Sequence, residues 1–261
     1  MMLKDKVMVV YGAGGAIGGA VACTAAREGA RLFVTGRSRA QVEALARDIV
    51  AAGGSAEAAT VDALDEQAID QHLEYVQDRA GRVDVSFNAV GVPETTVIGV
   101  PLLELDAEQL ARPITTYATT FFLTARLAAR RMIPNGSGVI MTVTALPART
   151  GTTLNGGYGP AMAAKEALTR DLSAELAPHG VRVVSVRPHG IPGTATMDHV
   201  RELKAAGLDD EQFRGYLAST SHPRRVMRLA EVADAAVFLA SDRASGFTGT
   251  TVNLTMGAVA D

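Results

Sequence analysis

Seven short runs of β-branched and apolar residues alternate with longer helical patterns, and this alternation constrains the fold more than any other feature. The runs lie at 6–12, 31–36, 57–62, 83–91, 138–145, 181–188 and 250–255. The helical patterns lie at 16–30, 39–54, 66–81, 106–132, 157–178 and 230–240. Strands that alternate with helices and are apolar on both faces form a parallel sheet between two helical layers. With right-handed crossovers, the sequence predicts a doubly wound α/β fold with a mostly parallel seven-stranded sheet.

The chain has no internal repeat, low-complexity tract or linker, so we expect one domain over residues 1–261. One segment, 189–222, interrupts the alternation with a loop and one or two short helices. It follows a late strand, and open α/β sheets bind ligands beyond the carboxyl ends of their strands. We therefore expect 189–222 to be a lid over a substrate.

Composition and charge exclude several classes of protein. The net charge of -3 gives no reason to expect nucleic acid or an anionic membrane as a partner. Cys23 is the only cysteine, which excludes an internal disulfide and a metal-thiolate cluster, and the histidines show no metal-ligand grouping. No signal peptide or membrane-length apolar run is present. The sequence predicts a cytoplasmic protein that acts on a small molecule and binds no metal.

A glycine-rich stretch, "VVYGAGGAIGGA", follows the first strand and opens the first helix. Glycines at such a turn let backbone N–H groups approach a phosphate at the helix N-terminus. The spacing Gly-x-Gly-x-x-Gly fails at its third position, but Gly-x-x-x-Gly-x-Gly fits with Ala16 in the middle. The alternative is a turn that only packs the helix tightly on the strand. The predicted phosphate-binding residues are Gly12, Gly14, Gly15, Ile17 and Gly18.

Four stretches, taken in their order along the chain, are typical of one protein family. They are this turn, "FNAVG" (87–91), "AELAPHGVRVVSVRP" (174–188) and residues 228–257. Together they resemble the short-chain dehydrogenase/reductase family over nearly the whole chain, although Tyr11 stands where the family has Thr. The resemblance implies a Rossmann-type fold, a nicotinamide cofactor and a homodimer or homotetramer formed through the long helices. It implies cofactor contacts for Asn88, Gly91 and Thr194. Asp62 matches the family's adenine-contacting acid, or is an ordinary loop aspartate.

The end of the second strand indicates which cofactor is preferred. Enzymes that prefer NAD commonly place Asp or Glu there, whereas this chain has Gly36 followed by Arg37 and Arg39. A guanidinium can pair with the 2′-phosphate of NADP in a bidentate fashion. The sequence therefore favours NADP(H). The alternative is that Arg37 only belongs to a solvated loop.

The catalytic residues of the family are only partly retained. The family uses Asn, Ser, Tyr and Lys, and a gap-free alignment places Tyr158 on the tyrosine and Met162 on the lysine. Ala145 stands at the serine position and Thr116 at the asparagine position. Without a nearby ammonium, a tyrosine with a pKa near 10 is a poor base at neutral pH but can still donate a proton. We therefore expect any redox reaction to run as a reduction.

Two other side chains are candidates for the missing groups. Lys165 lies seven residues after Tyr158, a spacing that returns to nearly the same helix face. We weigh a catalytic Lys165 against a solvated or ion-paired one and favour the latter. His189 stands where the family has glycine, and it is either a replacement acid/base or a loop histidine bonded to the backbone. Thr142 and Thr144 alternate on one strand face and are interpreted as structural.

These patterns predict an atypical NADP(H)-dependent short-chain reductase of a small carbonyl or conjugated alkene, with Tyr158 as the proton donor. The predicted catalytic set is Tyr158, Lys165, His189 and Thr116. The alternatives are a non-redox enzyme on the same fold, such as a cyclase, dehydratase or isomerase, and a catalytically silent partner subunit.

Overall fold

The core is one seven-stranded sheet in the order β3-β2-β1-β4-β5-β6-β7, in which all neighbouring strands are parallel. A computed structural model gives this structure and describes residues 1–91 and 98–260. The strands are β1 (Val7–Tyr11), β2 (Arg31–Gly36), β3 (Ser55–Thr60), β4 (Val85–Asn88), β5 (Gly138–Val143), β6 (Val181–Pro188) and β7 (Thr250–Leu254). The predicted doubly wound fold is confirmed.

Eight α-helices are present in the described residues. They are α1 (Ala16–Arg27), α2 (Arg39–Ala51), α3 (Glu66–Ala80), α4 (Ala107–Met132), α5 (Tyr158–Leu176), α6 (Ala195–Lys204), α7 (Asp210–Ser219) and α8 (Leu229–Ala240). The expected helices occur with ends shifted by a few residues. α1 stops before Gly29, whose φ of 92° does not continue a helix. α4 accommodates Pro113 in its second turn without ending there.

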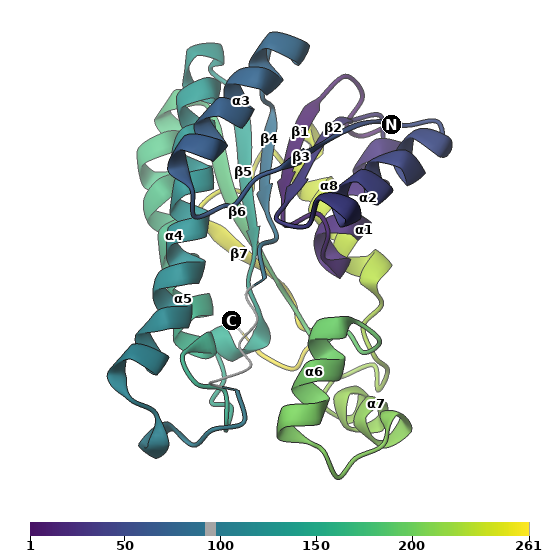
Figure 1. Ribbon diagram of the computed structural model, residues 1–261, viewed down its shortest axis with the longest axis vertical. Coiled ribbons are helices and arrows are strands. Elements are labelled where there is room, and N and C mark those ends of the chain that lie inside the picture. Colours follow the sequence, from purple (N-terminus) through teal and green to yellow (C-terminus); the bar gives the residue numbers. More distant parts are fainter. Residues whose placement is uncertain (92–97, 261) are drawn as a thin grey trace.

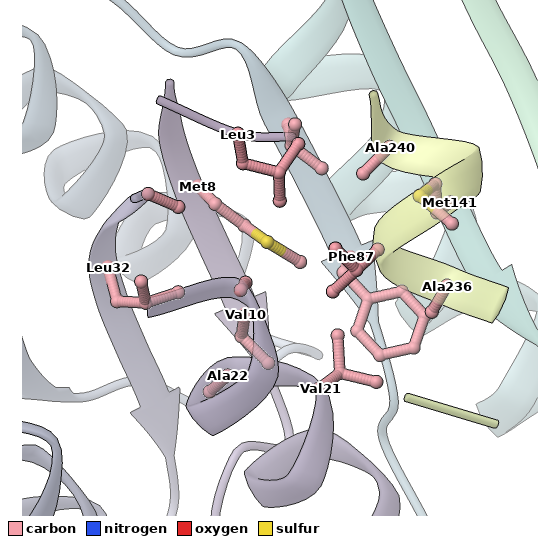
Figure 2. Close-up of a cluster of buried hydrophobic side chains, with 14 of the residues drawn as sticks. Leu3, Met8, Val10, Val21, Ala22, Leu32, Phe87, Met141, Ala236 and Ala240 are labelled. Atoms are coloured by element: carbon pink, nitrogen blue, oxygen red, sulfur yellow. The ribbon is translucent and has the colours of Figure 1, made fainter. Parts of the chain in front are cut away.

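Two helical layers cover the sheet. Helices α1, α2 and α8 lie on one face, and α3, α4 and α5 lie on the other (Figure 1). Figure 2 shows the first layer's core, in which Met8 and Val10 of β1 and Phe87 of β4 point toward Val21 of α1 and Ala236 of α8. These side chains are almost completely buried. Both faces of β1 are therefore covered, as expected for the centre of a parallel sheet.

The inner face of α5 is largely polar, unlike those of the other sheet-covering helices. Glu166 is buried and accepts hydrogen bonds from Nε of Arg187 on β6 at 2.8 Å and from its second guanidinium nitrogen at 3.0 Å. The Thr144 hydroxyl lies 3.1 Å from the same carboxylate. A charge-assisted bidentate pair in a buried place fixes geometry as well as distance. The pair therefore attaches α5 to the carboxyl ends of β5 and β6.

We predict that Glu166→Gln lowers the free energy of unfolding by about 3–5 kcal/mol, because it leaves the buried Arg187 guanidinium without its carboxylate. Urea denaturation measures the loss. The matched control is Glu43→Gln in the exposed Arg39–Glu43 pair of α2, which is expected to change stability little. Equal effects of the two substitutions would contradict the prediction.

Candidate active site

The carboxyl end of β1 runs into a tightly packed glycine turn. Gly12 has a φ of 75°, in the left-handed region that favours glycine. A Cβ atom on Gly12 would lie 2.6 Å from the carbonyl oxygen of Ala89, and one on Gly18 would overlap the carbonyl oxygen of Gly12. The turn, the segment after β4 and the start of α1 therefore meet through backbone atoms. Close packing alone requires glycine at these two positions.

The N-terminus of α1 is open to a ligand. Its N-cap residue, Gly15, provides no side-chain cap, and the first turn of the helix contains no acidic residue. Gly14, Gly15 and Ala16 are exposed. Such a terminus offers free N–H groups and a positive dipole end to an anion. These residues fit the pyrophosphate of a dinucleotide, whereas the side chain of Ile17 packs in an apolar cluster with Ile191 and Val232.

Tyr11 does not fill the glycine turn. Its side chain is fully buried in the core between the sheet and the α3–α4 layer, where Phe33 and Leu73 belong to the same cluster. The phenol oxygen has no hydrogen-bond partner among the described residues, and burial raises its pKa. Tyr11, which stands where the resembled family has threonine, therefore packs in the core beneath the turn and does not block the turn itself.

The end of β2 borders the same turn. A Cβ atom on Gly36 would lie 3.9 Å from the backbone nitrogen of Gly14. Arg37 follows, is exposed and has no hydrogen bond or ion pair in residues 1–91 and 98–260. Arg39 instead bonds Glu43 of its own helix at 2.6 Å. The guanidinium beside the turn that remains available to a phosphate is therefore that of Arg37.

The other predicted cofactor contacts have structural partners. Asp62 is exposed, but its Oδ1 accepts the N–H of Leu64 at 3.0 Å. The buried Asn88 amide donates to the Thr124 hydroxyl of α4 at 3.1 Å, which ties β4 to that helix. Thr194 caps α6 by accepting the N–H of Met197 at 3.3 Å. These side chains shape the loops around the turn, and Gly91 has open space at its Cβ position.

Tyr158 is the first residue of α5, at the edge of the sheet's carboxyl ends. Its N–H donates to the carbonyl of Asn155 at 3.1 Å, and its ring is half-buried. The ring packs edge to face against Tyr117 of α4, with centroids 5.7 Å apart at an interplanar angle of 73°. Tyr117, and not the neighbouring Thr116, belongs to the buried cluster around Tyr158. Thr116 is half-buried.

The position that the sequence alignment assigned to the family's lysine is apolar. Met162, one turn after Tyr158, is 2 % exposed and belongs to a cluster with Tyr117, Tyr158 and Ala145. Ala145 stands where the family has serine. Thr144 beside it is engaged with Glu166 and with the Val186 carbonyl, as the structural interpretation of this threonine predicted.

Lys165 is neither solvated nor ion-paired in the described chain, so that expectation was wrong. Its side chain is 1 % exposed, and its ammonium donates to the carbonyl of Val143, the last residue of β5, at 2.8 Å. The ammonium also lies 5.7 Å from the ring centroid of Tyr117 and 5.9 Å from that of Phe121. It points inward because α5 presents this face to α4 and the sheet. Burial lowers the pKa of Lys165 to about 7.

His189, the first residue of segment 189–222, is buried. It is 5 % exposed, and its Nε2 is 2.9 Å from the Thr220 hydroxyl at the end of α7. Its Nδ1 is 3.4 Å from the Gly190 carbonyl, so a backbone contact is present but is the weaker of the two. Burial lowers the pKa of His189, which keeps the imidazole neutral at pH 7.

Helices α6 and α7 lie beyond the carboxyl ends of the strands, opposite the N-terminal end of α4 (Figure 1). Lys204 at the end of α6 donates to Oδ1 of Asn155 at 3.2 Å. The same Asn155 supplies the carbonyl that holds the first N–H of α5. The segment predicted as a lid therefore contacts the loop that positions Tyr158.

A groove of about 630 Å³ lies beside this site but not over it. Leu105 and Leu110 line it from the α4 side, and Pro147 and Gly159 line it from the loop and helix that follow β5. Neither Tyr158 nor the glycine turn lines it. The candidate catalytic and phosphate-binding residues are therefore positioned by the carboxyl ends of the strands and by α5, and not by this groove.

In residues 1–91 and 98–260, no group of three or more His, Cys, Asp or Glu side chains is arranged to hold a metal ion. No helix of the described chain is long and apolar enough to cross a membrane.

A parallel sheet, an uncapped glycine turn after its first strand and a tyrosine at the start of the helix after its fifth strand define a dinucleotide-binding α/β protein. Comparison with known proteins gives the family. Residues 12–258 match a family model described as enoyl-(acyl carrier protein) reductase.

Two relatives and one solved structure align over nearly the whole chain. The 3-oxoacyl-[acyl-carrier-protein] reductase FabG of Escherichia coli is 30 % identical over 260 residues, covering 98 % of this chain and 98 % of that protein. An L-rhamnose 1-dehydrogenase (NAD(P)(+)) of Azotobacter vinelandii is 31 % identical over 255 residues, covering 95 % and 94 %. A crystal structure of an actinorhodin polyketide ketoreductase with NADPH is 25 % identical, with a TM-score of 0.88 and 97 % of both chains covered.

The chain belongs to the short-chain dehydrogenase/reductase family. Its relatives are named as reductases and dehydrogenases, and the protein is an oxidoreductase of this family.

We predict that Lys165→Met stabilises the protein, and most strongly below pH 7. With its pKa lowered from 10.5 to about 7, the folded state binds fewer protons than the unfolded state between these values. The stability of the unmodified protein then rises with pH across this window, whereas the variant lacks this rise. Urea denaturation should show the variant's advantage shrinking by about 1.4 kcal/mol per pH unit above pH 7. Parallel stability curves would contradict the burial of a titrating amine.

Proposed function

We propose that the protein is an NADP(H)-dependent reductase of a small carbonyl or conjugated alkene, with Tyr158 as the proton donor. The observation that carries this proposal is a half-buried phenol at the same, carboxyl edge of the sheet as the open dinucleotide turn, with the buried, apolar Met162 one turn further along α5. A phenol in such surroundings is a weak base and an adequate hydrogen-bond or proton donor.

Arg37 supports the preference for NADP(H). It lies just beyond the end of β2, exposed and without a partner in the described chain, where a 2′-phosphate would need a cation. The actinorhodin ketoreductase was solved with NADPH, while the L-rhamnose dehydrogenase is named for both cofactors. The preference therefore rests on Arg37 and not on the relatives.

Each part of the site has a distinct role in this proposal. The open N-terminus of α1 and the glycines before it hold the pyrophosphate, and Arg37 holds the 2′-phosphate. The nicotinamide supplies a hydride when it is bound. Tyr158 donates a proton to the substrate oxygen, or polarises that oxygen when the proton comes from solvent. Neutral, buried His189 is bonded to Thr220 and anchors the segment 189–222, which we propose acts as the lid.

The apolar pair of Ala145 and Met162 favours a second candidate function. Without the family's hydroxyl and ammonium, the fold would also suit a non-redox reaction steered by Tyr158, or a silent subunit. Consumption of NADPH with substrate distinguishes the reductase from both, because neither of them turns over the cofactor.

We also propose that the protein forms a homodimer or homotetramer. Phe122 on α4 is 39 % exposed. Phe238 on α8 and Phe247 before β7 are 37 % and 39 % exposed, and their rings pack edge to face. Exposed aromatic side chains on two such helices provide apolar surfaces that a second copy would cover.

We predict micromolar binding of NADPH and much weaker binding of NADH in fluorescence titrations. Arg37→Glu should weaken NADPH binding by roughly 100-fold, because a carboxylate replaces the cation that pairs with the 2′-phosphate. Arg47→Glu, the same charge change at an exposed position of α2, is the matched control and should bind NADPH normally. Equal affinities for NADH and NADPH would contradict the role of Arg37, and no binding of either would contradict the reductase.

We predict that Tyr158→Phe reduces NADPH consumption with ketones or enones by about 100-fold or more, the usual contribution of a positioned proton donor. NADPH binding should be unchanged, since the phenol is not part of the phosphate site. Tyr75→Phe, at an exposed tyrosine of α3, is the control and should keep full activity. Efficient alcohol oxidation at neutral pH by the unmodified protein would contradict the assignment of Tyr158 as donor only.

A further inference from the structure

Lys165 is a buried cation without a carboxylate partner in the described chain. Its ammonium has one hydrogen bond, to the Val143 carbonyl at 2.8 Å, and otherwise faces two aromatic rings. Burial of such a charge is costly unless it is compensated. A methionine or leucine would fill the same space without that cost. The presence of a charge at this buried position therefore points to a role beyond packing.

One of the two rings connects the ammonium to the candidate catalytic residue. The ammonium lies 5.7 Å from the Tyr117 ring centroid, and the Tyr117 ring packs edge to face with Tyr158 at 5.7 Å. Phe121, the second ring, lies 5.9 Å from the ammonium and has no ring contact with Tyr158 in the described chain. Tyr117 therefore contacts both the ammonium of Lys165 and the ring of Tyr158.

A cation over a ring face attracts its π electrons and restrains the ring, and this attraction is stronger when water is excluded. An edge-to-face pair depends on the orientation of both rings. Loss of the charge at Lys165 would therefore loosen Tyr117 and, through it, the ring of Tyr158. We propose that Lys165 is a positioning residue for Tyr158, acting through the ring of Tyr117. This inference rests on the proposed function of Tyr158 as proton donor.

The ionisation of Lys165 makes this arrangement sensitive to pH. Since burial lowers the pKa of Lys165 to about 7, the ammonium is present below pH 7 and is lost as the pH rises through it. The titratable group that faces the ammonium is Tyr117 of α4. Tyr158 and Glu166 lie on its own helix, α5, and Arg187 lies on the adjacent strand β6. Glu166 and Arg187 pair with each other, and no titratable side chain of β5 contacts the ammonium. His189 titrates at lower pH, because burial lowers its pKa.

The test follows the two tyrosines directly by NMR of protein labelled at the tyrosine Cζ carbon. The chain has five tyrosines, so single Tyr→Phe variants assign every signal. We expect the Tyr117 and Tyr158 signals to shift in a step centred at about pH 7, while Tyr216 shows none. Lys165→Met should remove both steps. Lys165→Arg, which stays charged, should hold both signals at their low-pH positions.

Tyr117 variants separate action through the ring from direct action of the charge. Tyr117→Phe keeps the ring and should keep the step at Tyr158, whereas Tyr117→Leu should remove it. Circular dichroism checks that each variant is folded, and Lys165→Arg with Tyr117→Phe provides the conservative pair if the others do not fold. Absence of the steps in the unmodified protein, or persistence of the Tyr158 step in folded Tyr117→Leu, would overturn the proposal.

The experiment needs no substrate, so its failure is separate from failure of the proposed function. A protein that shows the steps but consumes no NADPH would support the coupling and contradict the reductase. A protein that reduces a ketone or enone but shows no steps in the tyrosine signals would support the reductase and contradict the coupling. Where reduction is found, the rate of the unmodified protein should fall above pH 7 and that of Lys165→Arg should not.

Discussion

The ion pair between Glu166 and Arg187 is the interaction on which the geometry of the site depends. The inner face of α5 has few large apolar side chains, so hydrophobic packing alone would define its rotation poorly. The bidentate pair attaches the helix to β6 at a buried point and sets that rotation. Tyr158, Met162 and Lys165 then follow at helical spacing, and all three face α4 and the carboxyl end of β5.

The positive charge on this face of α5 is that of Lys165, two turns after Tyr158, and its ammonium contacts the ring of Tyr117. Met162 occupies the position one turn after Tyr158. Lys165 lies about one turn further along α5, where its side chain is buried away from water. The proposed role of the Tyr158 phenol is accordingly that of a proton donor. The lysine still lies close enough to an aromatic neighbour of Tyr158 for the charge and the ring packing to depend on each other.

Much of the fold and part of the site could be predicted from local patterns. Two-sided apolar runs separated by helical patterns arise only when strands are covered on both faces, so the parallel sheet followed from the sequence. Gly12 and Gly18 followed from the steric demands of a strand-to-helix turn. The gap-free register placed Met162 at the family's lysine position, and the structure shows that Met162 is buried beside Tyr158. By contrast, the expectation that Lys165 is solvated or ion-paired was wrong. The sequence of α5 has no apolar stripe from which the buried face of the helix can be identified.

The sequence by itself determined the order of strands and helices, the positions where only glycine fits, and the presence of Met162, not a lysine, one helical turn after Tyr158. Only the tertiary structure decided the state of the charged and polar groups. It buried Lys165 against α4, joined His189 to the end of α7 and turned Tyr11 into the core. The physical reason is that local backbone preferences act between near neighbours in the chain. The desolvation and partners of a side chain come instead from segments that are distant in sequence and meet only on folding.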